Sequence, residues 1–282
     1  MIAFNGQYLP AASHGNMRIT AACLGGQLMM SWLKASTQQA IIAAFGAEEG
    51  IAVIRRTNDY LNALALTDPT RAQQLAMFIN EDPLLVTSLV ETSKTRWLVG
   101  DGVAYVDTGI APSANCIFEV SMKVDVNATY CSNGCRIAYQ NTMFANQVYI
   151  GSGQFPGAFF DVGSNRILTG VMPTIGEGYK YKLDCLNKKA YVNDSEFAVN
   201  AFAGSALPIF LFGTNNNGEM SNGGKQDIDS ASITNGENQA KFLPFTRNGE
   251  NGMLDIISGT FYPNANTEGA FTIAITDKTP LL

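Results

Sequence analysis

Two acidic side chains, Asp227 and Asp229, stand one residue apart in the segment QDIDSAS. On an extended strand, residues two positions apart project from the same face, so both carboxylates would lie on one side. Hydrolysis of a glycosidic bond with retention uses two such carboxylates, about 5–5.5 Å apart. This pair is therefore the first place in the sequence to consider for catalysis.

The surrounding residues argue against that chemistry. The segment resembles the E-x-D-x-x-E strand of β-glucanases only superficially, because its first acid is Asp227 and Ser232 stands where a third acid belongs. Nucleophile-elbow, phosphate-loop, zinc-protease and C-x-x-C motifs are also absent from the sequence. We expect a solvated strand face at the pair, no catalytic residue, and a protein that is not an enzyme.

Cysteine and histidine usage leaves little room for a metal centre. The chain has five cysteines and one histidine, His14. Without a recognisable secretion signal, an odd number of cysteines argues against a disulfide framework. The spacing of Cys131 and Cys135 in CSNGC does not match a zinc knuckle. We expect free thiols and no metal site, with a local disulfide as the alternative at CSNGC.

Composition excludes two classes of partner. The 282 residues are 46% hydrophobic and 15% charged, with a formal net charge of −6. A chain of this charge without a basic stripe does not attract nucleic acid. The most apolar window, residues 203–213, is too short to cross a bilayer. The first residues lack a basic region followed by an apolar one, so we expect no signal peptide and no membrane insertion.

The pattern of elements divides the chain into three segments. Residues 1–34 contain short strands and turns, with Asn5-Gly6 and Gly25-Gly26 as hairpin signals. Residues 35–93 have helical spacing, and residues 94–282 alternate as strands. The first segment is too small to form its own core, so we expect it to pack on something else.

Helix start and stop signals are frequent in the second segment. Ser36 with Gln39 forms a capping-box pattern, and Gly46 would end that helix. Asp68-Pro69 and Asp82-Pro83 each place an acidic cap before a proline in the first turn. We expect a small packed helical unit here, and the alternative is a groove that binds a partner.

The third segment alternates strictly between apolar and polar residues. Cys116, Phe118, Val120, Met122 and Val124 fall on one face, and the other face holds Glu119, Ser121, Lys123 and Asp125. Asn-Gly clusters such as Asn235-Gly236 separate the successive strands and suit type I′ turns. Many short strands over this length favour a two-sheet antiparallel sandwich of the jelly-roll type, preceded by a small β motif and short helices.

Four stretches, at residues 105–110, 209–215, 230–236 and 242–262, resemble in their order the concanavalin A-like or laminin-G-like jelly rolls found in phage structural proteins and gut-bacterial surface proteins. They are the stretches YVDTGI at 105–110, IFLFGTN at 209–215, SASI with NG at 230–236, and FLPFTRNGENGMLDIISGTFY at 242–262. The sequence departs from the family pattern at Leu254, where a tyrosine is usual. Asp255 in this last stretch is expected to cap its own turn, with a metal or sugar contact as the alternative.

The N-terminal thirty residues carry a second resemblance. Ala22, Leu24-Gly25, Leu28 and Trp32 follow the hairpin pattern of tail, baseplate and head-fibre proteins of phages that infect Bacteroidales. The resemblance implies virion attachment by residues 1–34, a connector at 35–93 and a displayed jelly roll at 94–282. It also implies synthesis in the bacterial cytoplasm and a final location in the virion.

These resemblances imply a structural virion protein of a tail, baseplate or fibre, whose jelly roll binds a host surface or carbohydrate. The implied partners are other virion proteins, further copies of the chain, with a trimer as the expected form, and a host glycan. No cofactor is expected, and Ca²⁺ is left open. The alternative is a capsid decoration, head-fibre or assembly protein that makes only protein contacts. The candidate sugar-binding residues are Phe155, Phe159, Phe160, Asn215, Asn217, Asn222, Asn264 and Asn266.

Overall fold

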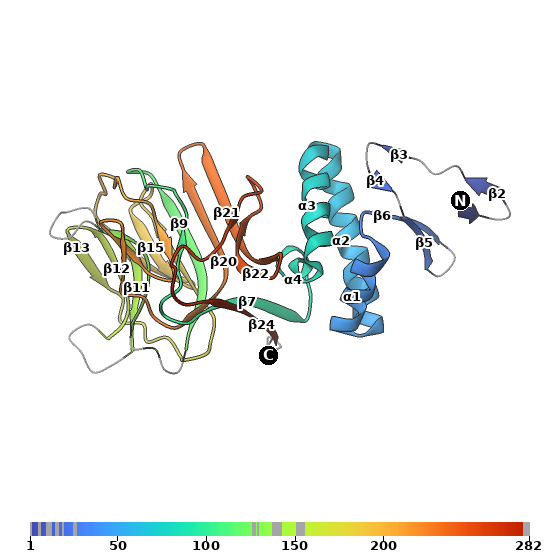
Figure 1. The fold of residues 1–282 in the computed structure, drawn as a ribbon. Helices are drawn as coiled ribbons and strands as arrows, with labels where there is room; N and C mark the ends of the chain where they lie inside the picture. The colour runs from blue at the N-terminus through green and yellow to red at the C-terminus, as the bar shows by residue number, and fades with distance from the viewer. Residues whose placement is uncertain are drawn as a thin grey trace. The chain divides into compact units, whose positions relative to one another are not determined.

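The computed structural model divides the chain into two compact units. One comprises residues 1–94 with 277–282, and the other comprises residues 95–276 (Figure 1). The structure describes residues 31–278 except 126–127, 129, 137–142 and 151–155, together with the backbone of six short strands in residues 1–30. The boundary expected from the sequence, between 93 and 94, lies one residue from this division.

The first thirty-one residues form three antiparallel hairpins. Their strands are β1 (Ile2–Phe4) with β2 (Gln7–Leu9), β3 (Ser13–His14) with β4 (Met17–Arg18), and β5 (Thr20–Leu24) with β6 (Gln27–Ser31). The hairpins expected around Asn5-Gly6 and Gly25-Gly26 are therefore present, although those turn residues lie outside the described residues.

Three α-helices follow, and their ends obey local chemistry. They are α1 (Ala35–Phe45), α2 (Ala47–Thr67) and α3 (Pro69–Glu81). Gly46 ends α1 with a φ of 82°, which a residue with a side chain rarely adopts. Asp68 accepts the backbone N–H of Arg71 and caps α3, as predicted. Asp82 caps a 3₁₀ turn, η1 (Pro83–Leu85), which continues into the short α4 (Val86–Leu89) rather than a full fourth helix.

The capping box predicted at Ser36 is wrong. The N-cap of α1 is Lys34, two residues before Ser36, and its side chain does not cap the helix. Asn80 of α3 supplies the missing acceptor instead, since its Oδ1 accepts the Lys34 N–H and the Thr37 hydroxyl, both at 2.8 Å. A contact from a distant helix cannot be predicted from the residues around the start of α1.

The helices bury one face each. The buried apolar side chains of α1, α2 and α3 exclude water from the centre of the unit. These side chains are Ile41, Val53, Ile54, Leu61, Ala72, Leu75, Ala76, Phe78 and Ile79.

The second unit is a β-sandwich of two sheets (Figure 1). The six-stranded sheet has the order β13 (Asn165–Leu168), β12 (Gly157–Gly163), β11 (Met143–Tyr149), β10 (Tyr130–Arg136), β18 (Thr214–Asn216) and β19 (Glu219–Ser221). Its neighbouring strands are antiparallel except for β10 and β18.

The ten-stranded sheet forms the other layer. Its main path runs β16 (Ser195–Ala198), β15 (Lys189–Val192), β14 (Tyr179–Asp184), β9 (Ile117–Val124), β20 (Gln226–Asn235), β21 (Asn238–Arg247), β22 (Glu250–Asp255) and β23 (Phe261–Tyr262). Strand β7 (Lys94–Gly100) pairs with β20 and with β24 (Phe271–Asp277). A short pair, β8 (Val106–Asp107) with β17 (Phe210–Leu211), completes the unit.

One core lies between the two sheets. Phe118 of the ten-stranded sheet and Phe144 of the six-stranded sheet are fully buried, with ring centroids 6.1 Å apart. The alternation predicted for residues 116–125 is confirmed, because every second residue of β9 is buried. The apolar run Ile209–Phe212 is buried throughout, as expected for a strand covered on both faces. The chain is therefore mostly β with a helical N-terminal segment.

Two turn predictions have different outcomes. The hairpin at Asn235-Gly236 is present, but its central residues are Gly236 and Glu237, and only Gly236 has a positive φ. That pattern fits a type II′ turn rather than the predicted type I′. Gly252 is required for close packing, because a Cβ there would clash with the carbonyl oxygen of Tyr262.

Candidate binding face

The aromatic segment singled out in the sequence is not an exposed platform. Phe159 and Phe160 lie on β12 and are 2% and 0% exposed. Phe160 belongs to the core between the sheets, and Phe159 projects from the opposite side of the strand. Phe155 lies outside the described residues.

The three asparagines of the second candidate loop hold a turn together. Asn215 is buried, donates to the Pro208 carbonyl at 3.0 Å and accepts the Gly218 N–H at 2.8 Å. Asn217 and Asn222 have φ angles of 57° and 53°, a region that asparagine tolerates better than most residues. Their residue type is thus explained by the backbone around β18 and β19.

Side-chain hydrogen bonds to the backbone also fix the third candidate loop. Asn264 accepts the Tyr105 N–H at 3.1 Å and donates to the carbonyls of Glu268 and Gly269. Asn266 donates to the Val103 carbonyl and accepts the Glu268 N–H. Both amides are therefore engaged with the backbone of their own unit.

The paired acids do not form the solvated strand face that the sequence suggested. A β-bulge between Ile228 and Ser230 breaks the two-residue period at Asp229. Asp227 is only 9% exposed and pairs with Lys123 at 3.0 Å. Burial raises the pKa of both carboxyl groups, and the Lys123 contact partly offsets the rise at Asp227.

Asp255 has the capping role expected of it. Its Oδ1 accepts the N–H groups of Lys241 and Ile257, and its Oδ2 accepts that of Ser258. Among the described residues, no group of three or more His, Cys, Asp or Glu side chains could hold a metal ion.

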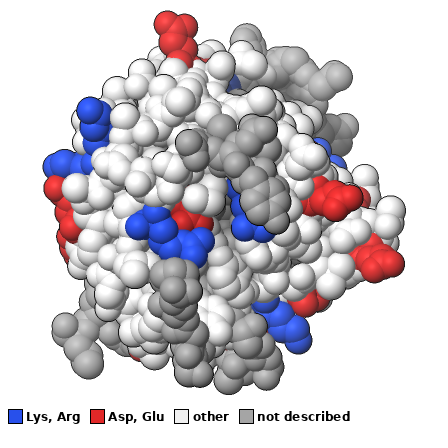
Figure 2. Space-filling view, turned by 90° about the vertical axis from the view of Figure 1, so that its left-hand side faces the viewer, with Lys and Arg blue, Asp and Glu red and all other residues white. Residues whose placement is uncertain are grey.

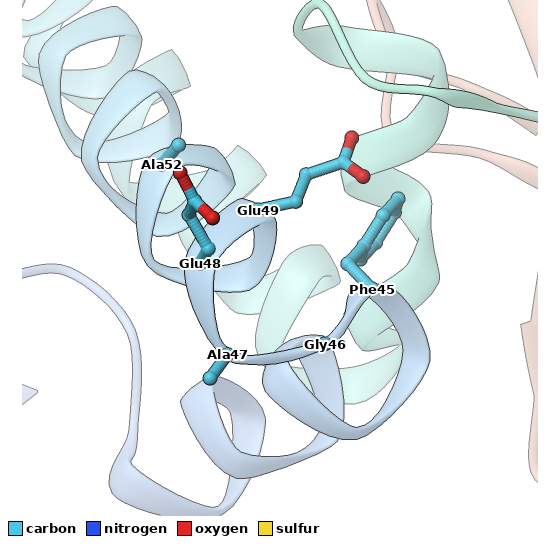
Figure 3. Close-up of a pocket in the computed structure, with 6 residues that line it drawn as sticks. All are labelled: Phe45, Gly46, Ala47, Glu48, Glu49 and Ala52. Carbon is cyan, nitrogen blue, oxygen red and sulfur yellow. The ribbon is translucent and has the colours of Figure 1, made fainter.

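Two surface depressions are shallow. The larger, of about 490 Å³, lies at the turn between α1 and α2 (Figure 3). Figure 3 shows the carboxylates of Glu48 and Glu49 directed away from each other, and Glu49 is used structurally, since it accepts the N–H and hydroxyl of Ser93 at 2.7 and 2.6 Å. These bonds lower the pKa of Glu49. The smaller, of about 140 Å³, lies on β9, β14 and β15 among ordinary cross-strand charges such as Glu119 and Lys180.

A more unusual set of side chains projects from the six-stranded sheet, away from the core. Phe144, Val148, Phe160 and Val162 point into the core, so the residues between them face the other way. The residues on this side, which we name the outer face, are Tyr130, Ser132, Gly134 and Arg136 of β10, Ala145, Gln147 and Tyr149 of β11, Phe159 and Asp161 of β12, and Arg166 of β13.

Strand register brings these side chains next to one another. Tyr130 lies opposite Tyr149, Ser132 opposite Gln147, and Gln147 opposite Phe159. Figure 2, viewed from the side of this sheet, shows the described charged side chains in small mixed groups on a mainly uncharged surface. The outer face therefore has no extended patch of one sign among the described residues.

The centre of the outer face is an ion pair between a buried carboxylate, Asp161, and a partly exposed arginine, Arg166. Arg166 donates to Asp161 through Nε and Nη2, both at 2.8 Å, and Gln147 donates to the same carboxylate through Nε2. Gln147 and Asp161 are at most 2% exposed although they face away from the core. Bidentate charge-assisted bonds in such a place are strong and orient the groups around them.

Three polar atoms on this side of the sheet lack partners among the described residues. Oε1 of Gln147, Nε of Arg136 and Oδ1 of Asn216 are buried, and no described group hydrogen-bonds to any of them. Asn216 lies opposite Arg136 on the neighbouring strand β18. A buried polar atom without a partner costs about 1–3 kcal/mol, so these atoms would gain from a ligand that supplies the missing bonds.

Aromatic rings complete the outer face. The rings of Tyr130 and Tyr149 lie 6.2 Å apart between centroids, and Tyr130 meets Phe159 edge-on at the same distance. The Arg166 guanidinium lies 4.6 Å above the Phe159 ring. Burial raises the pKa of Tyr130 to about 12, and the negative charge of Asp161 adds to the rise, so its hydroxyl stays a hydrogen-bond donor.

Sequence reasoning missed the outer face because its residues come from four strands. The one local signal was the pairing of Phe159 and Asp161 two positions apart in GAFFDVG, followed by Arg166 across a tight turn. Every residue of β12 is buried, so the alternation that marks a half-exposed strand is lost there.

No known family model matches the chain, and no curated protein is significantly similar to it. No helix in the described part of the chain has the length and apolar character needed to cross a membrane. The fold therefore defines the class at hand, a chain with one β-sandwich unit and one small helical unit.

Proposed function

We propose that the chain is a non-enzymatic structural protein of a phage virion, of a tail, baseplate or fibre. Its sandwich is a concanavalin A-like jelly roll displayed for binding carbohydrate on the host surface. The observation that carries this proposal is the outer face, where the unpartnered amide oxygen of Gln147 lies near the tyrosine pair and the unpartnered Arg136 and Asn216 lie at the other end of β10.

The arrangement of the resembling stretches supports the jelly-roll assignment. The stretch at 105–110 contains β8 and the stretch at 209–215 contains β17, and these two strands pair directly. The rings of Tyr105 and Phe210 stack with centroids 4.5 Å apart. Segments about a hundred residues apart thus meet in one pair of strands, which supports assigning both stretches to a single fold.

The chemistry of the outer face suits a sugar. A sugar hydroxyl both donates and accepts, so it can satisfy the acceptors of Gln147 and Asn216 and the donor of Arg136. Binding sites for small ligands combine apolar or aromatic surface with a few placed polar groups, as here with Tyr130 and Tyr149. A single shallow site of this kind binds at about millimolar strength, or ~4 kcal/mol.

Several copies on one particle would raise that affinity by avidity. The other partners in this proposal are virion proteins and further copies of the chain, with a trimer as the simplest displayed form. The attachment role falls to the N-terminal unit. There Asn58 and Asn80 bond the backbone of Trp32 at 2.9 and 3.0 Å, which anchors the segment that follows β6.

A decoration or assembly protein that makes only protein contacts is the second candidate. Helix α1 (ASTQQAIIAAF) has no charged residue, and Leu66 and Met77 are 88% and 65% exposed. Apolar surface of this kind fits an interface with another protein. That surface belongs to the N-terminal unit, so it is compatible with both candidates.

A glycan array probed with the full-length chain, with and without Ca²⁺, separates the two. The proposed function predicts binding to a defined group of glycans, carried by the outer face. An array with no bound glycan in either condition would reject the carbohydrate role and favour the protein-contact role. Release of reducing sugar from any array component would instead reject the non-enzymatic assignment.

A further inference from the structure

The charges on the outer face indicate which class of carbohydrate it would bind. Arg166 and Asp161 face each other across β12 and β13, and both guanidinium bonds go to that carboxylate. Their charges cancel within the protein. A ligand therefore meets little net charge from this pair.

Arg136 differs from Arg166 in having nothing to balance it. It lies at the end of β10 on the same face, and within the described residues its guanidinium has no ion pair and no hydrogen bond. Its Nε is buried, but the side chain as a whole is only partly buried, so a ligand oxygen can reach the guanidinium. An anionic oxygen would satisfy this donor with a charge-assisted bond.

From this geometry we propose that the outer face binds an acidic oligosaccharide, with a sugar carboxylate held by Arg136. The inference rests on the proposed carbohydrate role. Two amide acceptors flank the positions that the ligand would occupy, Asn216 opposite Arg136, and Gln147 opposite Ser132. Both accept hydrogen bonds from sugar hydroxyls, and both would repel a second anionic group.

The distance between Arg136 and the tyrosine pair requires a ligand of more than one sugar unit. Arg136 lies four residues from Ser132 along β10, about 13 Å at the rise of a strand. Gln147 sits across from Ser132, next to the tyrosine pair. A chain of sugars can carry a carboxylate at one end and stack a neutral ring at the other.

One acid lies close enough to oppose the ligand. Glu219 of β19 is exposed and lies opposite Asn216, so it is two strands from Arg136 on the same face. Its negative charge would weaken binding of a carboxylate. Replacing Glu219 with Gln should therefore tighten binding of the acidic glycan while leaving neutral glycans unaffected.

The test uses the full-length chain and pairs of glycans that differ only in the carboxylate. Oligogalacturonates and sialylated oligosaccharides serve as acidic probes, and the same molecules after reduction of the carboxyl group to an alcohol serve as neutral controls. Affinities are measured for the wild type, Arg136→Gln, Arg136→Lys and Glu219→Gln, with Lys189→Gln on the other sheet as the matched control. Thermal unfolding checks that each variant is folded.

The inference predicts that the carboxylate form binds at least tenfold more tightly than its reduced form, and that salt weakens this binding. Arg136→Gln should remove the preference, Arg136→Lys should keep part of it, and Lys189→Gln should leave it unchanged. The comparison of acidic and reduced glycans uses the wild-type protein alone. The inference can therefore be tested even if Arg136→Gln does not fold.

The failures are distinguishable. Binding of neutral glycans with equal or greater affinity, or an acidic preference that survives in a folded Arg136→Gln, would overturn the inference and leave the carbohydrate role intact. Binding of no glycan of either kind would overturn both.

Discussion

Oδ1 of Asn133 accepts the backbone N–H of Phe212 at 2.7 Å. Phe212 is fully buried and has a φ of 68°, which is rare for a bulky residue. The chain leaves the β8–β17 pair here and joins the six-stranded sheet through β18. The Asn133 side chain thus stabilises the left-handed backbone conformation of Phe212, between the end of β17 and the start of β18.

Replacing Asn133 with Ala should destabilise the protein by about 2 kcal/mol, because the buried Phe212 N–H would lose its acceptor. The matched control is Asn146→Ala on the paired strand, since Asn146 is equally buried, its Nδ2 lies 3.8 Å from the Met122 sulfur, and its Oδ1 has no partner among the described residues. We expect it to cost clearly less. Urea unfolding measures both, and equal losses would contradict the role given to Asn133.

In the N-terminal unit, Asn80→Ala should cost about 1–2 kcal/mol, because Asn80 bonds Lys34, Thr37 and Trp32 at once. Ser36→Ala should change stability by less than about 0.5 kcal/mol, because Ser36 is exposed inside α1 and caps nothing. Thermal unfolding of the two variants checks this. A larger loss of stability for Ser36→Ala would instead support the capping box predicted from the sequence.

Acid should destabilise the sandwich in part through Asp101. Burial raises its pKa, but bonds from the N–H groups of Ala104, Val103 and Ala270 outweigh burial and lower it below the usual 3.8. The folded-state pKa is therefore below the unfolded one. The stabilisation is present above pH 3.8 and is lost as the pH falls through the folded-state value.

Asp101→Asn should flatten the acid side of a stability–pH curve measured by urea unfolding. Asp227→Asn provides a contrast, because burial raises the pKa of Asp227 in the folded state. Its contribution falls as the pH rises from 3.8 through that raised pKa, so its removal should flatten the curve in the opposite sense. The same change of slope in both variants would show that these assignments are wrong.

Four cysteines of the sandwich should resist alkylation in the native protein. Cys116, Cys131, Cys135 and Cys185 are buried and free, and burial raises the pKa of the last three to about 12. Thiolate is the reactive form, so labelling at pH 8 should follow global unfolding. Mass spectrometry of a Cys23→Ser variant treated with iodoacetamide checks this. Rapid native labelling of any of the four would contradict the burial.

Several elements could be predicted because their signals are local. The alternation of β9, the Asp68-Pro69 start of α3 and the capping role of Asp255 depend on neighbouring residues, and the structure confirms each. The cap of α1 could not be predicted, because Asn80 lies 46 residues from Lys34. The bulge at Asp229 likewise depends on pairing with β9.

The candidate site also depends on contacts that the local sequence does not reveal. The segment FPGAFF suggested an exposed aromatic loop, but Phe159 and Phe160 belong to a strand covered on both sides. The outer face depends on the register of β10 to β13, which brings Gln147 beside Asp161 and leaves Arg136 apart. Register is a property of the whole sheet and is not marked in any one strand.

The most direct test of the central claim compares two tyrosines. Tyr149 lies on the outer face, and Tyr191 lies on β15 of the other sheet. For a glycan selected from the array, affinity should fall about tenfold or more in Tyr149→Ala and stay unchanged in Tyr191→Ala, since only the first loses ligand contact. Wild-type affinity in a folded Tyr149→Ala, or an equal loss in Tyr191→Ala, would contradict binding at the outer face.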